Sequence, residues 1–155
     1  MKRLENTIPP PVLWLVASIL TFVVDRFDLD GSPLQSTIAE WGGVALAAVG
    51  VGIAMLGGRR FARAGTTFDP HTIDSASTLV TGGIYRVSRN PMYLGLVLLS
   101  IGWALRLGTA VGMIVGTGSL VIALTYLQIR PEERALRERF GDDYDRYRST
   151  VRRWI

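Results

Sequence analysis

Four long stretches of the chain contain no Asp, Glu, Lys or Arg, and they dominate its pattern of polar and apolar positions. These stretches are residues 8–24, 41–58, 90–105 and 107–129. They are 17, 18, 16 and 23 residues long, and a helix needs about 20 mainly apolar residues to cross a bilayer. The pattern therefore predicts an all-α integral membrane bundle of four transmembrane helices. We expect these helices at about residues 10–27, 40–58, 90–106 and 108–129.

A fifth helical pattern follows the last apolar stretch. Its apolar positions recur every three or four residues, as on one face of a helix. They are Leu136, Phe140, Tyr144, Tyr147 and Val151. The spacing predicts a cytosolic amphipathic helical tail over residues 131–151 that lies on the membrane surface. With 155 residues in total, the chain has room for a single domain, residues 1–155.

The positive charges alternate between the connections of the predicted helices. Three alternate segments hold 15 of the 17 Lys and Arg residues: the N-terminus, the connection 59–89 and the tail from residue 130. The positive-inside rule assigns segments rich in Lys and Arg to the cytoplasm. It therefore predicts that both the N-terminus and the C-terminus are cytoplasmic.

The composition excludes several kinds of site. The chain has no cysteine, which excludes disulfides, thiol catalysis and iron–sulfur clusters. His71 is its one histidine, so we expect no metal site. The net charge of +4 follows from the cytoplasmic arginines. Because no nucleic-acid-binding motif accompanies that charge, we expect no nucleic acid partner.

Glycine recurs within two of the apolar stretches. Gly108, Gly112 and Gly116 follow one another at intervals of four residues, which is typical of closely packed helices in membranes. The second stretch holds Gly42, Gly43, Gly50 and Gly52. We expect these glycines to pack helices together, and they would also permit a homodimer. The sequence from Arg106 to Gly108 predicts a tight turn and an antiparallel helical hairpin.

The third stretch begins with residues that suit a helix N-terminus at the membrane surface. Asn90 is a preferred N-cap residue, and Pro91 suits the first helical position. Tyr93 and Gly95 follow in the first turns. The free N–H groups of a helix N-terminus can hold a carboxylate or another oxygen-rich ligand. Gly95 would let either a ligand or another helix approach closely.

Two carboxylates stand where the fourth stretch leaves the membrane. Glu132 and Glu133 follow Pro131, and acidic residues stabilise the first turn of a helix. A carboxylate near the membrane surface is also a suitable ligand for a cation. The two glutamates could therefore stabilise the start of a helix, bind a cation, or do both.

Three ordered motifs resemble one known superfamily. They are Gly83-Ile84-Tyr85-Arg86, then Arg89-Asn90-Pro91-Met92-Tyr93-Leu94-Gly95, then Glu132-Glu133 with Leu136, Phe140-Gly141, Tyr144 and Tyr147. Over about residues 40–155 the chain resembles the isoprenylcysteine carboxyl methyltransferase and phospholipid methyltransferase superfamily, and most of all its short bacterial members. The family pattern normally has histidine where this chain has Asn90. The substitution removes an imidazole but keeps a hydrogen-bonding side chain.

The resemblance implies S-adenosylmethionine as the methyl donor, held between the start of the third helix, the end of the fourth and the tail. It implies cofactor-binding roles for Tyr85, Asn90, Pro91, Tyr93, Gly95 and Glu132. Glu132 would pair with the ammonium group or the ribose hydroxyls of the donor, and Arg89 or Arg86 with its carboxylate. For an amine acceptor, Glu133 would be the general base. We therefore expect Glu133 and Arg89 to be the catalytic residues.

The resemblance also implies partners and a location. We expect a bacterial inner membrane protein whose acceptor is amphipathic or lipid-like, such as an isoprenylcysteine-type carboxylate or a lipid amine, and reaches the site from the lipid bilayer. Two alternatives stay open. The sterol reductases carry a similar motif and use NADPH, but they have Gly-Glu after the tyrosine where this chain has Leu94-Gly95. The second alternative is a non-enzymatic membrane assembly protein.

Overall fold

The computed structural model describes residues 7–27, 29, 31–63 and 78–155. Within these residues the chain is helical and contains no β-strand, as predicted. Several residues that entered the sequence argument lie outside the described residues, namely Lys2, Arg3 and His71.

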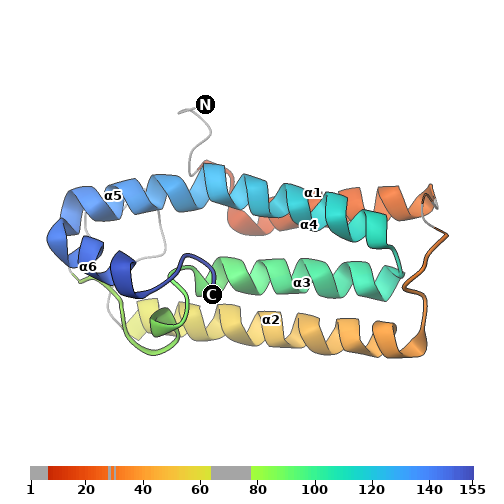
Figure 1. Cartoon of the computed structure of the whole chain (residues 1–155), viewed down its shortest axis with the longest axis horizontal. Helices are drawn as coiled ribbons and strands as arrows, with labels where there is room; N and C mark the ends of the chain where they lie inside the picture. Colours follow the sequence, from red (N-terminus) through yellow and green to blue (C-terminus); the bar gives the residue numbers. More distant parts are fainter. Residues whose placement is uncertain (1–6, 28, 30, 64–77) are drawn as a thin grey trace.

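Four long helices run side by side along the molecule (Figure 1). They are α1 (Pro10–Arg26), α2 (Thr37–Arg63), α3 (Pro91–Leu107) and α4 (Ala110–Leu124). α2 packs on α3, and α1 packs on α4, while α3 also contacts α1 and α4. α3 is therefore the central helix, and its first residues lie next to elements from other parts of the chain.

α3 and α4 form the predicted antiparallel hairpin. Gly108 ends α3 in the left-handed conformation, with a φ of 86°, which glycine adopts without steric cost. Thr109 then begins α4, because its hydroxyl accepts a hydrogen bond of 3.0 Å from the backbone N–H of Gly112. The predicted tight turn is confirmed, with Gly108 at its centre.

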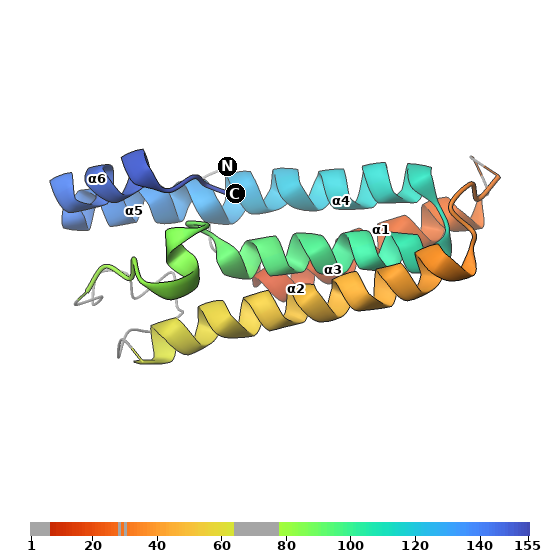
Figure 2. The same cartoon turned by 60° about the horizontal axis from the view of Figure 1, so that its bottom comes forward.

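α4 continues well beyond its apolar part. A π-helical turn, Thr125–Ile129, joins it to α5 (Arg130–Phe140), and together they form one long helix (Figure 2). Gly141, with a φ of 49°, separates α5 from α6 (Asp142–Thr150), which folds back along α5. The tail predicted over residues 131–151 is therefore two helices, because the left-handed glycine ends the first of them.

Two helices in the described part of the chain are long and apolar enough to cross a membrane, Thr37–Arg60 and Ala110–Phe140. α3 is apolar but shorter, and α1 has 17 residues. The structure thus supports an all-helical membrane protein, while four membrane crossings stay a prediction. The charge-free part of the longer helix ends at Ile129, so the residues from Arg130 onward lie beyond its apolar span.

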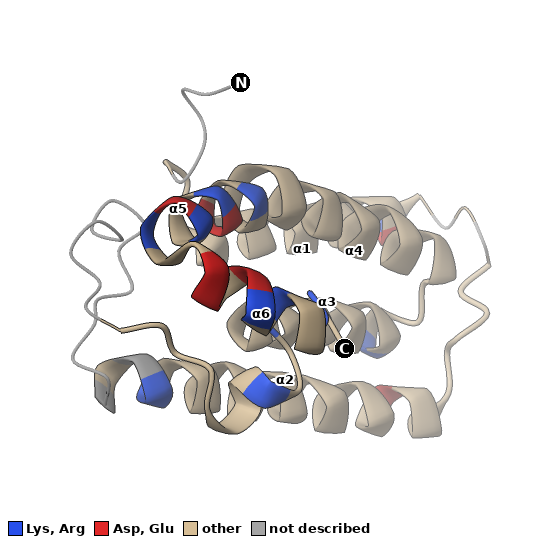
Figure 3. Ribbon diagram, turned by 60° about the vertical axis from the view of Figure 1, so that its left-hand side comes forward, with Lys and Arg blue, Asp and Glu red and all other residues tan. Residues whose placement is uncertain are grey.

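Charge is concentrated at one end of the bundle. Figure 3 shows that acidic and basic residues are mainly on α5 and α6, with few along the long helices. Large apolar side chains of α1 and α2 are exposed instead, among them Ile19, Trp41 and Val49. An extended apolar surface marks a contact with membrane or protein. The bundle therefore has an apolar outer surface and one polar end, as a membrane protein requires.

Glycines bring the backbones of α2 and α3 into direct contact. A Cβ atom built on Gly43 would lie 2.6 Å from the carbonyl oxygen of Gly102. One built on Gly50 would lie 2.6 Å from the carbonyl oxygen of Gly95. Real Cβ atoms do not come this close to backbone oxygens, so only glycine fits. We call these four residues the glycine seam.

The other predicted packing glycines divide into two groups. Gly112 and Gly116 face α1, where a Cβ on Gly116 would lie 2.9 Å from the carbonyl oxygen of Ala17. A Cβ on Gly42 or Gly52 would have no atom of the described part of the chain within 4 Å. The expected packing role is therefore confirmed for Gly43, Gly50, Gly112 and Gly116, and it does not hold for Gly42 and Gly52 among the described residues.

The C-terminal segment returns to the middle of the bundle. Trp154 packs against a buried apolar cluster of Ala17, Leu120, Leu124 and Ile129. Tyr93, on the first turn of α3, packs against the same cluster. The last residues of the chain therefore lie beside the start of α3.

Candidate functional site

The start of α3 is fastened to the C-terminal segment. The backbone N–H of Arg89 donates to the carbonyl oxygen of Arg152 at 3.0 Å, and Nδ2 of Asn90 donates to that of Arg153 at 3.0 Å. The hydroxyl of Ser88 also donates to the carbonyl oxygen of Arg153, and it accepts from the N–H of Asn90 at 3.1 Å. Asn90 occupies the predicted N-cap position, but its side chain makes no capping bond. Its amide holds the C-terminal segment instead.

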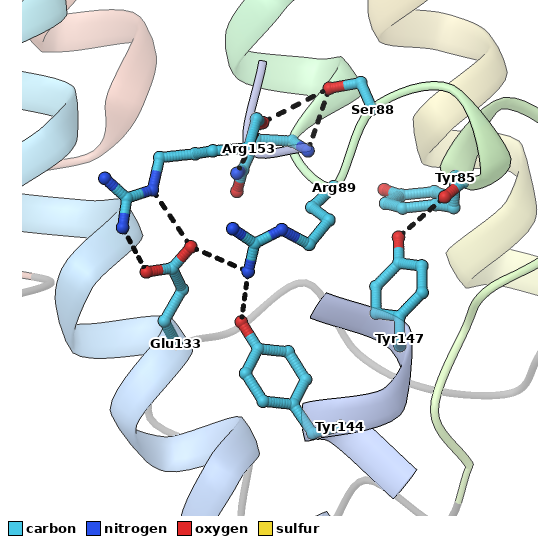
Figure 4. Close-up of polar contacts among 8 residues, drawn as sticks. Tyr85, Ser88, Arg89, Glu133, Tyr144, Tyr147 and Arg153 are labelled. Carbon is cyan, nitrogen blue, oxygen red and sulfur yellow. Dashed lines mark hydrogen bonds and ion pairs between the residues drawn. The ribbon is translucent and has the colours of Figure 1, made fainter. Parts of the chain in front are cut away.

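Glu133 lies between two arginines (Figure 4). Arg153 donates to both of its carboxylate oxygens, at 3.0 and 2.6 Å, and Nη1 of Arg89 lies 3.1 Å from Oε1. The side chain of Arg89 is only 9% exposed, and that of Glu133 is 17% exposed. Paired, charge-assisted hydrogen bonds of this kind fix geometry as well as charge. Glu133 is therefore held rigidly by residues from two other segments of the chain.

Tyr144 of α6 completes this group. Its hydroxyl accepts a hydrogen bond from Nη1 of Arg89 at 3.1 Å. Burial raises the pKa of Tyr144, the charge of Glu133 raises it further, and the charge of Arg89 lowers it. Tyr144 is therefore a neutral phenol that helps to orient the guanidinium of Arg89. We call Arg89, Glu133, Tyr144 and Arg153 the arginine–glutamate cluster.

Glu132 has a different environment from its neighbour Glu133. The hydroxyl of Tyr93 donates a hydrogen bond to its Oε1. Burial raises the pKa of Glu132 from 4.5 to about 7, while the hydrogen bond from Tyr93 lowers it and the charge of Glu133 raises it. The carboxyl group of Glu132 thus gains or loses its proton near neutral pH. A cation that binds beside it would favour the ionised form.

A second tyrosine bond joins α6 to the turn before α3. The hydroxyl of Tyr147 donates to the carbonyl oxygen of Tyr85 at 2.7 Å. Tyr85 is itself buried within the 3₁₀ turn Gly83–Arg86. Burial raises the pKa of Tyr85 and of Tyr147 well above the ordinary value, so both are neutral phenols. The predicted residue Tyr85 therefore lies against α6, at the edge of the cluster.

The π-helical turn places one more polar side chain in the interior. Gln128 is fully buried, and its Nε2 donates to the carbonyl oxygen of Ile8 at 2.8 Å. Its Oε1 has no hydrogen-bond partner in the described part of the chain. Gln128 lies four residues before Glu132, so both are on the same side of the helix. A π-helical turn frequently occurs at a functional position of a helix.

The structure brings the predicted residues of α3 and α5 together. Tyr93 contacts Glu132, and Arg89 contacts Glu133. Asn90 lies between Arg89 and Tyr93 in the sequence, and its side chain binds the segment that carries Arg153. The two predicted halves of the site therefore form one polar group where the apolar part of α4 has ended.

Pro91 and Gly95 have roles in the helix itself. Pro91 is buried at the first position of α3, where proline suits the helix start. Gly95 faces α2, and a Cβ on it would lie 2.8 Å from the Cβ of Ala54. Of its two expected roles, the structure shows the close approach of another helix. Contact of either residue with a cofactor stays a prediction.

Sequence reasoning missed Ser88, Gln128 and Arg153. No local pattern distinguishes Arg153 from the other arginines of the tail, because only the fold brings it to Glu133. Gln128 had a signal, since it is the one amide side chain in the charge-free stretch 107–129. A buried amide needs hydrogen-bond partners, so its position in an apolar helix pointed to a specific role.

The polar groups of this site fit the amino-acid portion of a ligand, which carries an ammonium and a carboxylate close together. Glu132 offers a largely buried carboxylate to the ammonium. Arg89 offers a guanidinium whose buried Nε has no partner among the described residues, and it suits the carboxylate. The charge of Arg89 is already paired with Glu133, but a ligand with both charges would satisfy its unpartnered Nε and the buried carboxyl group of Glu132.

Comparison with known proteins identifies a family. The sequence profile of the phospholipid methyltransferase family matches residues 38–143. An uncharacterized protein of Haemophilus influenzae is 39% identical over 64 residues, which are 41% of this chain and the whole of that protein. The protein-S-isoprenylcysteine O-methyltransferase of Schizosaccharomyces pombe is 39% identical over 74 residues, which are 47% of this chain and 30% of that protein. No solved structure matches the chain significantly.

Proposed function

The chain belongs to the phospholipid methyltransferase family, and we propose that it is an integral membrane enzyme that transfers a methyl group from S-adenosylmethionine to an acceptor at the membrane surface. One observation carries the proposal. The first turn of α3 brings Tyr93 to Glu132, and Arg89, just before that helix, pairs with the neighbouring Glu133, so acidic and basic side chains gather just past the apolar span of α4.

The residues of the site suit the methyl donor. S-adenosylmethionine supplies a methyl group that is already activated by a sulfonium charge. Glu132 would hold the ammonium of its amino-acid portion, and Arg89 the carboxylate. Tyr93 fixes the orientation of Glu132 through their hydrogen bond. The protein thus contributes mainly orientation and charge, which is what a displacement with an activated donor requires.

The position of Glu133 favours one class of acceptor. The sequence assigned Glu133 as the general base for an amine. Both of its oxygens are engaged by Arg153, so it would have to leave an arginine before it could accept a proton. An ionised carboxylate needs no base, and the surrounding arginines would attract it. We therefore favour a carboxylate acceptor, which agrees with the name of the fission yeast relative.

The acceptor would reach the site from the bilayer. The outer surface of the bundle is apolar, and the site lies where that surface ends. An amphipathic acceptor can keep its apolar portion in the membrane and place its polar end beside α5. In this arrangement the charged end of the bundle is cytoplasmic, as the positive-inside rule predicts.

A binding experiment tests the proposal. Purified protein in detergent is titrated by calorimetry with S-adenosylmethionine, and with NADPH for comparison. We expect saturable binding of S-adenosylmethionine alone, followed by transfer of labelled methyl groups to components of a membrane extract. Binding of NADPH alone would support the reductase alternative. Binding of neither compound by folded protein would favour the non-enzymatic alternative.

A further inference from the structure

A pocket of about 220 Å³ opens between α5 and α6. Four arginines line it, together with one glutamate and one tyrosine. The lining residues are Arg130, Glu133, Arg134, Arg137, Tyr144 and Arg148. The members on α5 are spaced by three and four residues, so they share one face of that helix. We call this feature the arginine pocket.

Positive charge prevails in the arginine pocket. Its one acidic lining residue, Glu133, is already bound by Arg89 and Arg153. Asp145 pairs with Arg137 at 3.1 Å. Arg130 and Arg148 have no acidic partner among the described residues, so their positive charges remain in the pocket. A concave surface with one sign of charge attracts ligands of the opposite sign.

The pocket begins directly after the apolar span of α4. Arg130 is the first charged residue after the charge-free stretch 107–129. Its guanidinium lies 4.1 Å from the ring centre of Tyr126, which is 43% exposed. Exposed tyrosines are typical of the membrane–water interface. In the membrane arrangement proposed above, the first arginine of the pocket therefore lies at the level of the bilayer phosphates.

We propose that the arginine pocket binds the phosphodiester group of an anionic membrane phospholipid. Guanidinium groups bind phosphate oxygens with paired hydrogen bonds. The headgroup should carry no ammonium, because an ammonium would lie among the arginines. A glycerol headgroup meets this condition, and a choline or ethanolamine headgroup does not.

The pocket does not suit the methyl donor itself. Its volume of about 220 Å³ is below the roughly 300–1,000 Å³ of pockets that enclose whole drug-sized ligands. S-adenosylmethionine also has a net positive charge, since its sulfonium and ammonium exceed its carboxylate. The arginine pocket thus shares Glu133 and Tyr144 with the arginine–glutamate cluster but opens between α5 and α6, and lipid binding there does not depend on methyl transfer.

The test measures, by calorimetric titration, the affinity of the full chain in a nonionic detergent for three probes. The probes are dihexanoylphosphatidylglycerol, dihexanoylphosphatidylcholine and inorganic phosphate. We expect saturable binding of the glycerol lipid and much weaker binding of the other two. The paired change Arg130→Gln and Arg148→Gln should weaken binding of the glycerol lipid about 30-fold, because each arginine near an anionic lipid contributes a factor of about 5.

Two further variants keep the test decisive. Arg139→Gln with Arg152→Gln removes the same charge from exposed positions outside the pocket, and it should weaken binding by less than about 3-fold. Arg130→Lys with Arg148→Lys keeps the charge and should bind better than the glutamine pair. Circular dichroism verifies that each variant is folded.

Four results would overturn the proposal. They are equal binding of the choline lipid, binding of inorganic phosphate as tight as that of the lipid, equal weakening in the control pair, and competitive displacement of the lipid by S-adenosylmethionine. Each of these results comes from a binding measurement and requires no measurement of enzymatic activity. Failure of this proposal would therefore leave the proposed methyl transfer untouched, and loss of methyl transfer would not affect it.

Discussion

The glycine seam and the arginine–glutamate cluster both hold α3 in place, but by opposite means. In the seam, the backbones of α2 and α3 meet directly, because Gly50 and Gly95 have no side chains. In the cluster, long charged side chains extend between segments, as Arg153 does to Glu133. The first depends on the absence of side-chain atoms, and the second on their charge.

This difference indicates how each region responds to substitution. An added methyl group in the seam has no space and must move a whole helix. The cluster has alternatives, because Glu133 has two arginine partners. We therefore expect seam substitutions to lower the stability of the bundle, and cluster substitutions to change ligand binding by a folded protein.

The largest effect should come from Glu132→Gln. This change removes the carboxylate proposed to hold the ammonium of S-adenosylmethionine, but keeps the shape of the side chain. The affinity for S-adenosylmethionine should fall about 100-fold, because loss of one partner of a buried charge pair is costly. Calorimetry of the variant measures it, with Glu138→Gln on the exposed side of α5 as the control. Unchanged affinity would rule out this role for Glu132.

The pH dependence of stability tests the same carboxyl group without a ligand. The pKa of Glu132 is raised from 4.5 to about 7, so the folded chain keeps a proton that the unfolded chain loses within this window. The free energy of unfolding should therefore fall as the pH rises from 4.5 to about 7, by about 3 kcal/mol in total. Thermal unfolding in detergent across the window measures the slope. Glu132→Gln should remove this contribution, and an unchanged slope would contradict the assignment.

The seam should be sensitive to a single methyl group. Gly50→Ala should lower the free energy of unfolding by about 1–3 kcal/mol, because its Cβ meets the backbone of α3. Gly52→Ala provides a matched control on the same helix, since nothing lies within 4 Å of its Cβ. The control should be neutral or stabilising by up to about 1 kcal/mol, as alanine favours helix. Equal stability of the two variants would show that the seam is not closely packed.

The cluster should tolerate the loss of one arginine. Arg153→Gln removes the paired bonds to Glu133 but leaves Arg89 in contact with it. The affinity for S-adenosylmethionine should fall about 10-fold, because Arg89 is then less firmly oriented, while the melting temperature changes little. Arg152→Gln, at the exposed neighbouring position, is the control and should have little effect. A large loss of stability in Arg153→Gln would contradict the expectation that only seam substitutions lower the stability of the bundle.

The smallest expected effect is that of Asn90→Ala. The change removes one hydrogen bond between α3 and the C-terminal segment, at a cost of about 1 kcal/mol in the free energy of unfolding. Ser149→Ala removes an exposed bond of α6 and should cost less than about 0.5 kcal/mol. Thermal unfolding of both variants measures these two changes in the free energy of unfolding. Equal costs would mean that Asn90 does not fasten the C-terminus.

The helical class, the turn at Gly108 and the helix start at Pro91 could all be predicted from the sequence. These features depend on local physics. Charge-free stretches form helices in an apolar environment, glycine adopts a left-handed turn, and proline suits a helix start. The motif residues Tyr93 and Glu132 were also recognisable from the sequence, although their contact was not.

Only the tertiary structure decided which residues meet. Gly50 packs against α3 while Gly52 does not, because the two face different sides of one helix. Glu132 and Glu133 likewise have different environments because they face different sides of one helix. Burial raises the pKa of Glu132, whereas Arg153, from the far end of the chain, binds the carboxylate of Glu133. Sequence pattern determines local conformation, but charge and burial at a site depend on neighbours that only folding brings together.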